Sequence, residues 1–317
     1  MKEAIFLEPV FKERIWGGTK LKELFGYNIP TDQTGECWAV SAHPNGQSVV
    51  KNGPLKGKPL GELWAEHKEI FGDAAGTSEV FPLLTKILDA SDDLSVQVHP
   101  DDEYARVHEN GELGKTECWY VLDAEPGAEI IYGHTAKTRD ELRKMIDDGA
   151  WDELLCRVPV KPGDFFYVPS GTIHALGKGI VVLETQQSSD TTYRVYDYDR
   201  TDASGNKREL HLDQAIQVTA VPHVGAQPTC ETKQIGGAKL TTFVSNEFFT
   251  VQRAELKGEL ELDPASTFRI CSVIAGSGEL QVEGQRYGLR RGEHFILPAA
   301  SEGIRFTGDL ELMFSWI

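Results

Sequence analysis

Short runs of β-branched and aromatic residues, separated by Gly and Pro at close spacing, constrain the fold of this chain more than any other feature. Runs of this kind form strands, and Gly and Pro mark the turns between them. They cover residues 94–99, 117–122, 129–132, 164–168 and 180–184, and then 240–244, 248–254, 269–275, 279–282, 294–297 and 310–316. Many short strands joined by close turns are typical of sandwiches and barrels, so the sequence predicts a mainly β protein.

Helical periodicity is confined to a few segments, which we expect to be insertions on the β framework. Apolar residues recur at the helical period over 57–71 and again over 138–155, where Thr138 is a suitable N-cap. A third, short helix is predicted over 212–218. The helices are therefore expected to decorate the sheets rather than to form a core of their own.

The two β-rich parts of the chain share a sequence pattern, which indicates two related units. Residues 163–169 are Gly, an acid, four strand residues and Pro, and residues 292–298 repeat this order. Only the first copy continues to a histidine, His174. We therefore predict a unit with metal ligands over 1–218, a connection over 219–239, and a second β unit without ligands over 240–317.

Composition and charge exclude several function classes. Lys plus Arg number 32 against 49 Asp plus Glu, which gives a formal charge of −17. Such a chain repels nucleic-acid phosphates and anionic lipids, so neither nucleic acid nor membrane is an expected partner. No apolar run approaches the roughly 20 residues of a membrane span, and the N-terminus lacks the apolar stretch of a signal peptide. The five cysteines are widely spaced and odd in number, which favours reduced thiols and a cytoplasmic protein.

Side chains with metal-binding atoms occur in two of the predicted strands and after the turn that follows a third. Alternation along the first strand places Ser95, Gln97 and His99 on one face. Glu117 lies in an otherwise apolar strand, where an unpaired carboxylate is costly to bury, and His174 follows a Pro-Gly turn. Two imidazoles, a carboxylate and an amide oxygen suit zinc, while two His and one carboxylate also match the non-haem iron triad.

The same residues resemble the two motifs of the cupin family. Gly163-x5-Pro169-x-Gly171-x2-His174 is similar to the second cupin motif, and Gln97-x-His99 followed by Glu117 is similar to the first, with Gln in place of His. The resemblance implies two cupin-like jelly-roll barrels with a few inserted helices. It also implies that Gln97, His99, Glu117 and His174 hold one metal ion per chain inside the first barrel. We expect zinc, with cobalt and manganese as alternatives.

A closer resemblance is to the type I phosphomannose isomerases, in their short bacterial branch. Its motifs lie between about residues 14 and 200 and are Trp16-Gly17-Gly18, the segments 35–41, 81–86 and 95–100, and Glu184 followed ten residues later by Arg194. The resemblance implies a metal-dependent aldose–ketose isomerase that interconverts mannose 6-phosphate and fructose 6-phosphate through a cis-enediol. The expected partner is thus a small sugar phosphate.

The resemblance also implies roles for individual side chains. Arg194 matches the catalytic arginine, and its guanidinium would stabilise the enediolate or hold a phosphate or hydroxyl group. Glu184 is the candidate for the proton shuttle, with orientation of a metal ligand as the alternative. Lys86 and Ser41 are candidates for binding the phosphate or the sugar hydroxyls.

Two other functions stay open at this point. One is an iron-dependent cupin dioxygenase built on His99, Glu117 and His174, and the other is a non-catalytic sugar-binding cupin. Nucleotide binding is not expected: Gly114-Lys115-Thr116 looks like the end of a phosphate-binding loop, but the required upstream glycine is absent and a strand follows.

Overall fold

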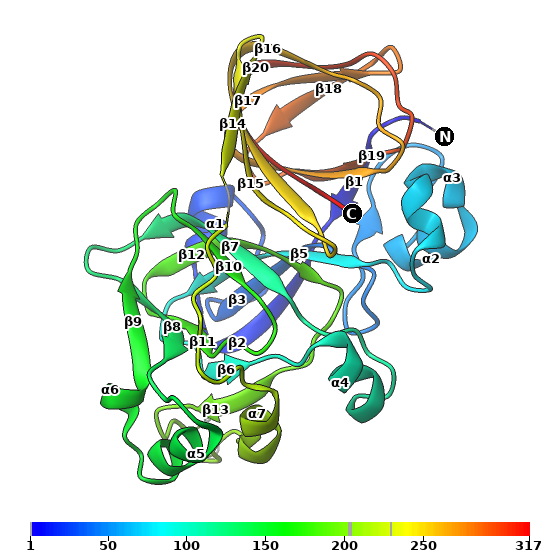
Figure 1. Ribbon diagram of the computed structural model, residues 1–317. Helices are drawn as coiled ribbons and strands as arrows, with labels where there is room; N and C mark the ends of the chain where they lie inside the picture. The colour runs from blue at the N-terminus through cyan, green and yellow to red at the C-terminus, as the bar shows by residue number, and fades with distance from the viewer. Residues whose placement is uncertain (1, 202–204, 229) are drawn as a thin grey trace.

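The structure is a computed structural model that describes residues 2–201, 205–228 and 230–317. It has two β lobes with short helices at their margins (Figure 1), and all the strand pairs between named strands are antiparallel in the described ranges. The expected mainly β fold with inserted helices is confirmed. None of the helices in the described ranges is long and apolar enough to cross a membrane.

The lower lobe in Figure 1 is built from two sheets. The six-stranded sheet has the order β10 (Phe165–Val168), β7 (Glu117–Ala124), β12 (Ile180–Gln187), β5 (Leu83–Ala90), β3 (Thr34–Val40) and β2 (Val10–Gly18). The five-stranded sheet has the order β13 (Tyr193–Tyr196), β6 (Val96–Val98), β11 (His174–Leu176), β8 (Glu129–His134) and β9 (Leu155–Pro159).

The upper lobe is one larger sheet that curls on itself (Figure 1). Its order is β14 (Glu231–Ile235), β15 (Ala238–Ser245), β16 (Thr250–Leu262), β20 (Ile304–Trp316), β17 (Arg269–Val282), β19 (His294–Leu297), β1 (Ile5–Glu8) and β4 (Val49–Val50), with β18 (Gln285–Arg290) paired to β17. The runs expected at 269–275 and 279–282 form this one long strand β17.

The division of the chain at 219–239 stays a prediction, and the sheet pairing adds two facts to it. Strand β1 comes from the start of the chain but pairs with β19 in the upper lobe. Strand β14 lies inside the expected connection and already belongs to the same sheet. The two lobes also share a hydrophobic core, in which Leu83 and Ile87 of β5 cluster with Phe268 and Ile270 near the start of β17.

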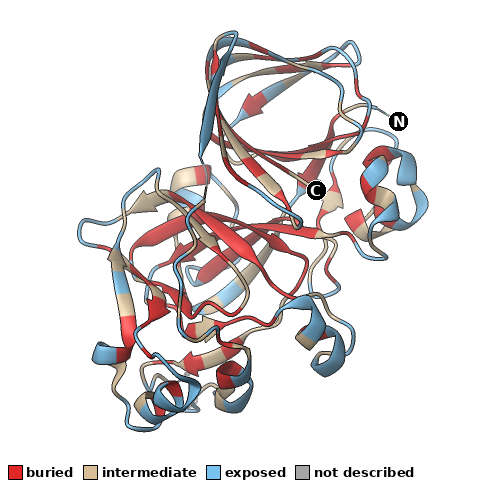
Figure 2. Cartoon of the chain, viewed as in Figure 1, coloured by how far each residue is buried: buried red, intermediate tan, exposed pale blue. Residues whose placement is uncertain are grey.

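The helices lie at the edges of the sheets, with their outer faces exposed (Figure 2). They are α1 (Lys20–Phe25), α2 (Leu60–Glu66), α3 (Lys68–Phe71), the 3₁₀ turn η1 (Asp73–Gly76), α4 (Asp102–His108), α5 (Arg139–Asp147), α6 (Trp151–Leu154) and α7 (Leu212–Val218). The expected helix over 212–218 is confirmed.

The two longer predicted helices are each divided in the structure. The segment 57–71 contains α2 and α3, which are separated by His67 in a non-helical conformation. The segment 138–155 contains α5 and α6, which are separated at Gly149, whose φ of 65° lies in the left-handed region. The expectation of single helices was therefore wrong, although the side-chain oxygen of Thr138 caps α5 as expected.

Strand alternation fixes which side chains enter the lower lobe. Strands β5 and β12 are buried along their whole lengths, so both of their faces are covered. Val181 and Leu183 belong to the core shared with the upper lobe, whereas Ile180 and Val182 pack with Trp119 inside the lower lobe. Because side chains alternate, Glu184 shares the inner face with Val182.

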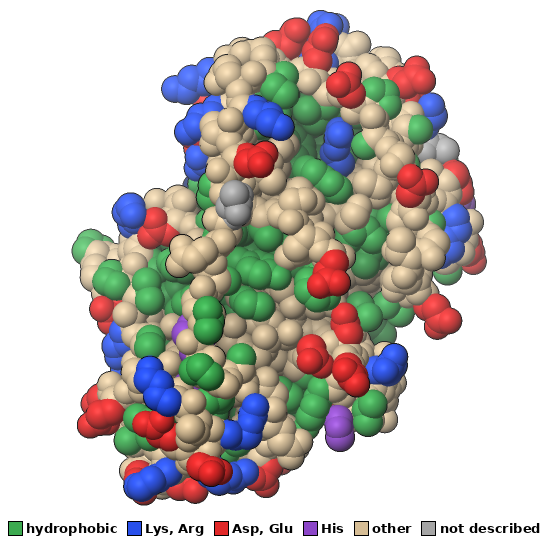
Figure 3. All heavy atoms as spheres, in the orientation of Figure 1, with side chains coloured by type: hydrophobic (Ala, Val, Ile, Leu, Met, Phe, Trp, Pro, Cys, Tyr) green, Lys and Arg blue, Asp and Glu red, His purple; other side chains and the backbone are tan. Residues whose placement is uncertain are grey.

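Charged side chains of both signs are interspersed over both lobes on the face drawn in Figure 3, and a hydrophobic area marks the waist between the lobes. The acidic side chains that give the chain its net charge of −17 are therefore spread out on this face, and its basic side chains do not gather into one patch there.

Candidate metal centre

The predicted metal ligands come from both sheets of the lower lobe. His99 lies directly after β6, and His174 is the first residue of the neighbouring strand β11, where it pairs with Gln97. Glu117 is the first residue of β7 in the opposite sheet. The two sheets therefore bring these side chains together between them.

His99, Glu117 and His174 form a compact, buried group. Their side chains are 0–1% exposed, and one ligand atom from each lies within 4.8 Å of the others. The Glu117 carboxylate lies 3.5 Å from His99 Nε2 through Oε2 and 3.3 Å from His174 Nε2 through Oε1. In the described part of the chain, no other cluster of three or more His, Cys, Asp or Glu side chains is this tight.

Hydrogen bonds to the outer ring nitrogens fix the tautomers of both histidines. His99 Nδ1 is 2.9 Å from Thr191 O, and His174 Nδ1 is 2.8 Å from Thr172 O. A carbonyl oxygen only accepts, so each Nδ1 carries the proton and each Nε2 directs a lone pair toward Glu117. This is the arrangement in which histidine ligands are oriented for a metal.

The electrostatics of the group fit a cation. His174 Nε2 and Glu117 Oε1 are buried without a hydrogen-bond partner, which is unfavourable unless a positive charge lies between them. Burial lowers the pKa of His174 to about 4, and burial together with the Lys115 ammonium lowers the pKa of His99 well below its ordinary value. Both imidazoles are therefore neutral near pH 7, which is their metal-binding form.

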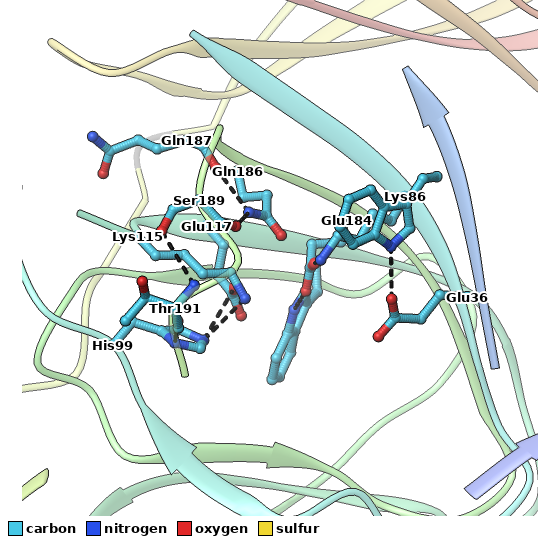
Figure 4. A network of polar contacts seen from close by, with 12 residues as sticks. Glu36, Lys86, His99, Lys115, Glu117, Glu184, Gln186, Gln187, Ser189 and Thr191 are labelled. Atoms are coloured by element: carbon cyan, nitrogen blue, oxygen red, sulfur yellow. Dashed lines mark hydrogen bonds and ion pairs between the residues drawn. The ribbon is translucent and has the colours of Figure 1, made fainter. Parts of the chain in front are cut away.

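Lys115 is the functional candidate that the sequence interpretation missed. Its side chain is 6% exposed, and its Nζ lies 2.9 Å from Glu117 Oε2 and 3.1 Å from His99 Nε2 (Figure 4). Burial alone would lower the pKa of Lys115, but the charges of Glu117 and Glu184 outweigh burial and raise it. Strand alternation could have identified Lys115, because it lies two residues before Glu117 and residues two apart in an extended segment share a face.

A cavity of about 480 Å³ lies beside the metal centre. Gln97 and Lys115 line it, as do the predicted catalytic residues Glu184 and Arg194 and the predicted binding residue Lys86. The cavity is also lined by five charged residues to which the sequence interpretation assigned no role, namely Glu13, Arg14, Glu36, Asp190 and Arg208.

Glu184 is held at the centre of a cross-strand triplet. It stands opposite Lys86 on β5 and opposite Trp119 on β7. Trp119 Nε1 donates to Glu184 Oε2 at 2.9 Å, and Lys86 Nζ lies 3.6 Å from Glu184 Oε1. Burial, and then the nearby Glu117 carboxylate, raise the pKa of Glu184.

Arg194 and Ser41 differ in their relation to the cavity. Arg194 lines it, and its guanidinium is anchored by Nε donating to Ser95 Oγ at 3.3 Å and Nη1 donating to Glu209 O at 2.7 Å. Ser41 is fully buried, does not line this cavity, and donates its hydroxyl to Gly46 O at 2.6 Å. In this geometry the Ser41 hydroxyl stabilises the turn that leads to Gly46.

Comparison with known proteins agrees with this geometry. Residues 5–123 match the family model "Phosphomannose isomerase type I, catalytic domain", and residues 239–317 match "Mannose-6-phosphate isomerase, cupin domain". The chain is 56% identical to mannose-6-phosphate isomerase of Streptococcus mutans over 99% of this chain and 98% of the relative. It is 55% identical to mannose-6-phosphate isomerase ManA of Bacillus subtilis, again over 99% and 98%.

Solved structures are similar over the whole length. The mannose 6-phosphate isomerase structure from Bacillus subtilis has a TM-score of 0.96 at 53% identity and covers 100% of both chains. A variant of phosphomannose isomerase from Salmonella typhimurium, at 16% identity, shares the fold with a TM-score of 0.80 over 99% of each chain. Because relatives at 55–56% identity span the whole of this chain, it belongs to the type I phosphomannose isomerase family.

Proposed function

We propose that this chain is a metal-dependent aldose–ketose isomerase that interconverts mannose 6-phosphate and fructose 6-phosphate. The observation that carries the proposal is the buried group His99, Glu117 and His174, which lies beside a cavity lined by Arg194 and Lys86. Relatives named mannose-6-phosphate isomerase, at 55–56% identity over the full chain, support the same reaction.

We propose zinc as the metal, held by His99, Glu117, His174 and Gln97. The donor set has two neutral imidazole nitrogens and a carboxylate, which zinc accepts readily, and Gln97 adds an amide oxygen from the strand next to His174. When bound, the ion supplies Lewis-acid stabilisation of sugar oxygens without redox chemistry.

The cavity residues supply the remaining functions of the reaction. Conversion through a cis-enediol needs a group that moves a proton between C1 and C2 and a group that stabilises the enediolate. Glu184 is our candidate for the proton transfer, because it lines the cavity and its raised pKa favours the exchange of a proton. Arg194 is our candidate for the enediolate, because its guanidinium is anchored at the wall of the same cavity.

Lys86 is our candidate for binding the phosphate or a sugar hydroxyl. It lines the cavity, and its ammonium also lies 4.9 Å from the centroid of the Trp38 ring. That contact and the Glu184 carboxylate restrain its side chain, so little conformational entropy is left to lose when the substrate binds.

We also propose a cytoplasmic location, because all five cysteines are free in the structure. The expected partner is a small sugar phosphate rather than nucleic acid, since the net charge is −17.

A coupled assay for fructose 6-phosphate formed from mannose 6-phosphate tests the proposal. The purified protein is measured directly, after chelation, and after zinc is restored. We expect activity that chelation removes and zinc returns. Oxygen consumption with bound iron and no fructose 6-phosphate would instead identify a cupin dioxygenase, and zinc binding without turnover would identify a sugar-binding cupin.

A further inference from the structure

Two adjacent glutamines end strand β12 next to the metal centre. Gln186 is 0% exposed and pairs with Glu117 across the sheet, and Gln187 is 7% exposed. Both lie close to Glu117 and Lys115 in Figure 4. Burying an amide side chain is unfavourable unless its polar atoms have partners. Both polar atoms of Gln187 form hydrogen bonds, whereas Gln186 uses its Nε2 and its buried Oε1 has no hydrogen-bond partner.

Gln186 fixes the turn that leads to the partner of His99. Its Nε2 donates to Gln187 O at 2.8 Å and to Ser189 O at 2.7 Å, and Ser189 N also donates to Gln187 O at 2.8 Å. Two residues further on, Thr191 O accepts the proton of His99 Nδ1. The amide of Gln186 therefore fixes the stretch of chain that sets the tautomer and orientation of a metal ligand.

Gln187 fixes the segment that carries Lys115. Its backbone N donates to Thr116 O at 3.0 Å, and its Oε1 accepts from Thr116 N at 2.9 Å. Its Nε2 donates to Asp102 Oδ1 at 3.0 Å, and the same carboxylate oxygen accepts from Gly114 N at 2.7 Å. The segment 114–116 is thus held from both sides directly before Glu117.

We propose that Gln186 and Gln187 are positioning residues of the metal centre. Gln186 places the carbonyl that orients His99, and Gln187, together with Asp102, places Lys115 and the entry into Glu117. Both segments are fixed by side chains at one strand end, so replacing these side chains changes the ligand geometry without removing a ligand. The inference rests on the proposed function only in taking this centre to hold a metal.

The test compares Gln186→Met and Gln187→Met with Gln47→Met. Methionine keeps the length of the side chain and removes its hydrogen bonds. Gln47 is the matched control, because its Oε1 accepts from Gly61 N at 3.0 Å and joins two backbone segments outside the metal centre. For each protein we measure the zinc dissociation constant by competition, the visible spectrum of the cobalt-loaded form, and the melting temperature of the metal-free form.

We expect Gln186→Met and Gln187→Met to weaken zinc binding by about 10- to 100-fold, the range seen for groups that orient metal ligands. Their cobalt spectra are expected to change, whereas Gln47→Met lowers only the melting temperature. Zinc affinity and cobalt spectra equal to wild type in both glutamine variants would overturn the proposal. Zinc binding is measured without substrate, so a wild-type protein that fails to isomerise mannose 6-phosphate would refute the proposed function separately.

A second pair of variants keeps the test decisive if the glutamine variants do not fold. Asp102→Ala removes the acceptor shared by Gln187 and Gly114, and Glu103→Ala removes an exposed carboxylate from the same first turn of α4. Both lose an equivalent interaction with the helix dipole. We expect only Asp102→Ala to weaken zinc binding, and equal affinity in the two variants would contradict the role of Gln187.

Discussion

Replacing Arg194 by lysine separates stabilisation of the transition state from binding of the phosphate. The guanidinium is anchored by Ser95 Oγ through Nε and by Glu209 O through Nη1, which leaves it fixed at the cavity wall. Lysine keeps the positive charge but has one nitrogen on a flexible stem, so it cannot reproduce this planar, anchored group. If Arg194 stabilises the enediolate as proposed, lysine loses at least one oriented, charge-assisted hydrogen bond to the reacting sugar.

The size of the effect follows from that single bond. A hydrogen bond to a charged group contributes about 1.5–3 kcal/mol, and about 1.4 kcal/mol corresponds to a factor of ten in rate. We therefore expect kcat to fall by roughly 10- to 200-fold. Negative charge on the enediolate develops only along the reaction, so kcat and kcat/KM fall together. Metal content is expected to stay the same, because Arg194 is not a ligand.

Steady-state kinetics in both directions, with metal analysis of the same samples, provide the assay. Arg143→Lys is the control, since Arg143 is an exposed arginine paired with Asp213 outside the cavity, and we expect wild-type kinetics from it. A variant at Arg194 with normal kcat and a greatly raised KM would refute this reasoning and assign the guanidinium to the phosphate.

Three further results are expected. His99→Ala or His174→Ala should abolish retention of the metal, because the remaining ligands cannot set its geometry; stoichiometric metal and full activity in either variant would reject the site. His294→Gln should leave turnover within about threefold, because His294 lies in the upper lobe, where it contacts Tyr27 and Ser272; a large loss with the fold intact would mean that this lobe completes the site. Burial lowers the pKa of His294 to about 3, so the folded state keeps it neutral while the unfolded state takes up a proton below about pH 6.5. The stability that neutral His294 contributes is therefore lost as the pH falls from about 6.5 toward 3. In urea unfolding over this pH range, the free energy of unfolding of wild type should fall by up to about 1.4 kcal/mol per pH unit more than that of His294→Gln. Identical slopes of unfolding free energy against pH in the two proteins would contradict this.

Much of the fold could be predicted from the sequence, because the signals were local. Alternation placed Ser95, Gln97 and His99 on one face, and the structure places Ser95 and Gln97 in the cavity wall and His99 beside Glu117. Helix positions were also local signals, but helix continuity was not. The apolar pattern runs on past His67 and Gly149, whereas the backbone at these two residues interrupts the helices.

The remaining features depend on tertiary contacts that no local pattern records. Strand β1 crosses to the upper lobe, because its partner β19 lies almost 300 residues later in the chain. In the sequence, Lys115 belongs to a segment that only resembles a phosphate-binding loop. Its place in the metal centre is evident only from the short distances of its Nζ to Glu117 and His99 in the folded chain. Asp190 follows the end of β12 in a turn, and only the packing of that turn against the cavity reveals it.

Metal-dependent isomerisation is tested most directly by titrating zinc into metal-free protein and measuring the fructose 6-phosphate formed from mannose 6-phosphate. We expect no turnover in the metal-free protein, a linear rise in activity with added zinc, and a plateau at one equivalent per chain. Full activity in the metal-free protein, or no fructose 6-phosphate at any zinc concentration, would contradict it.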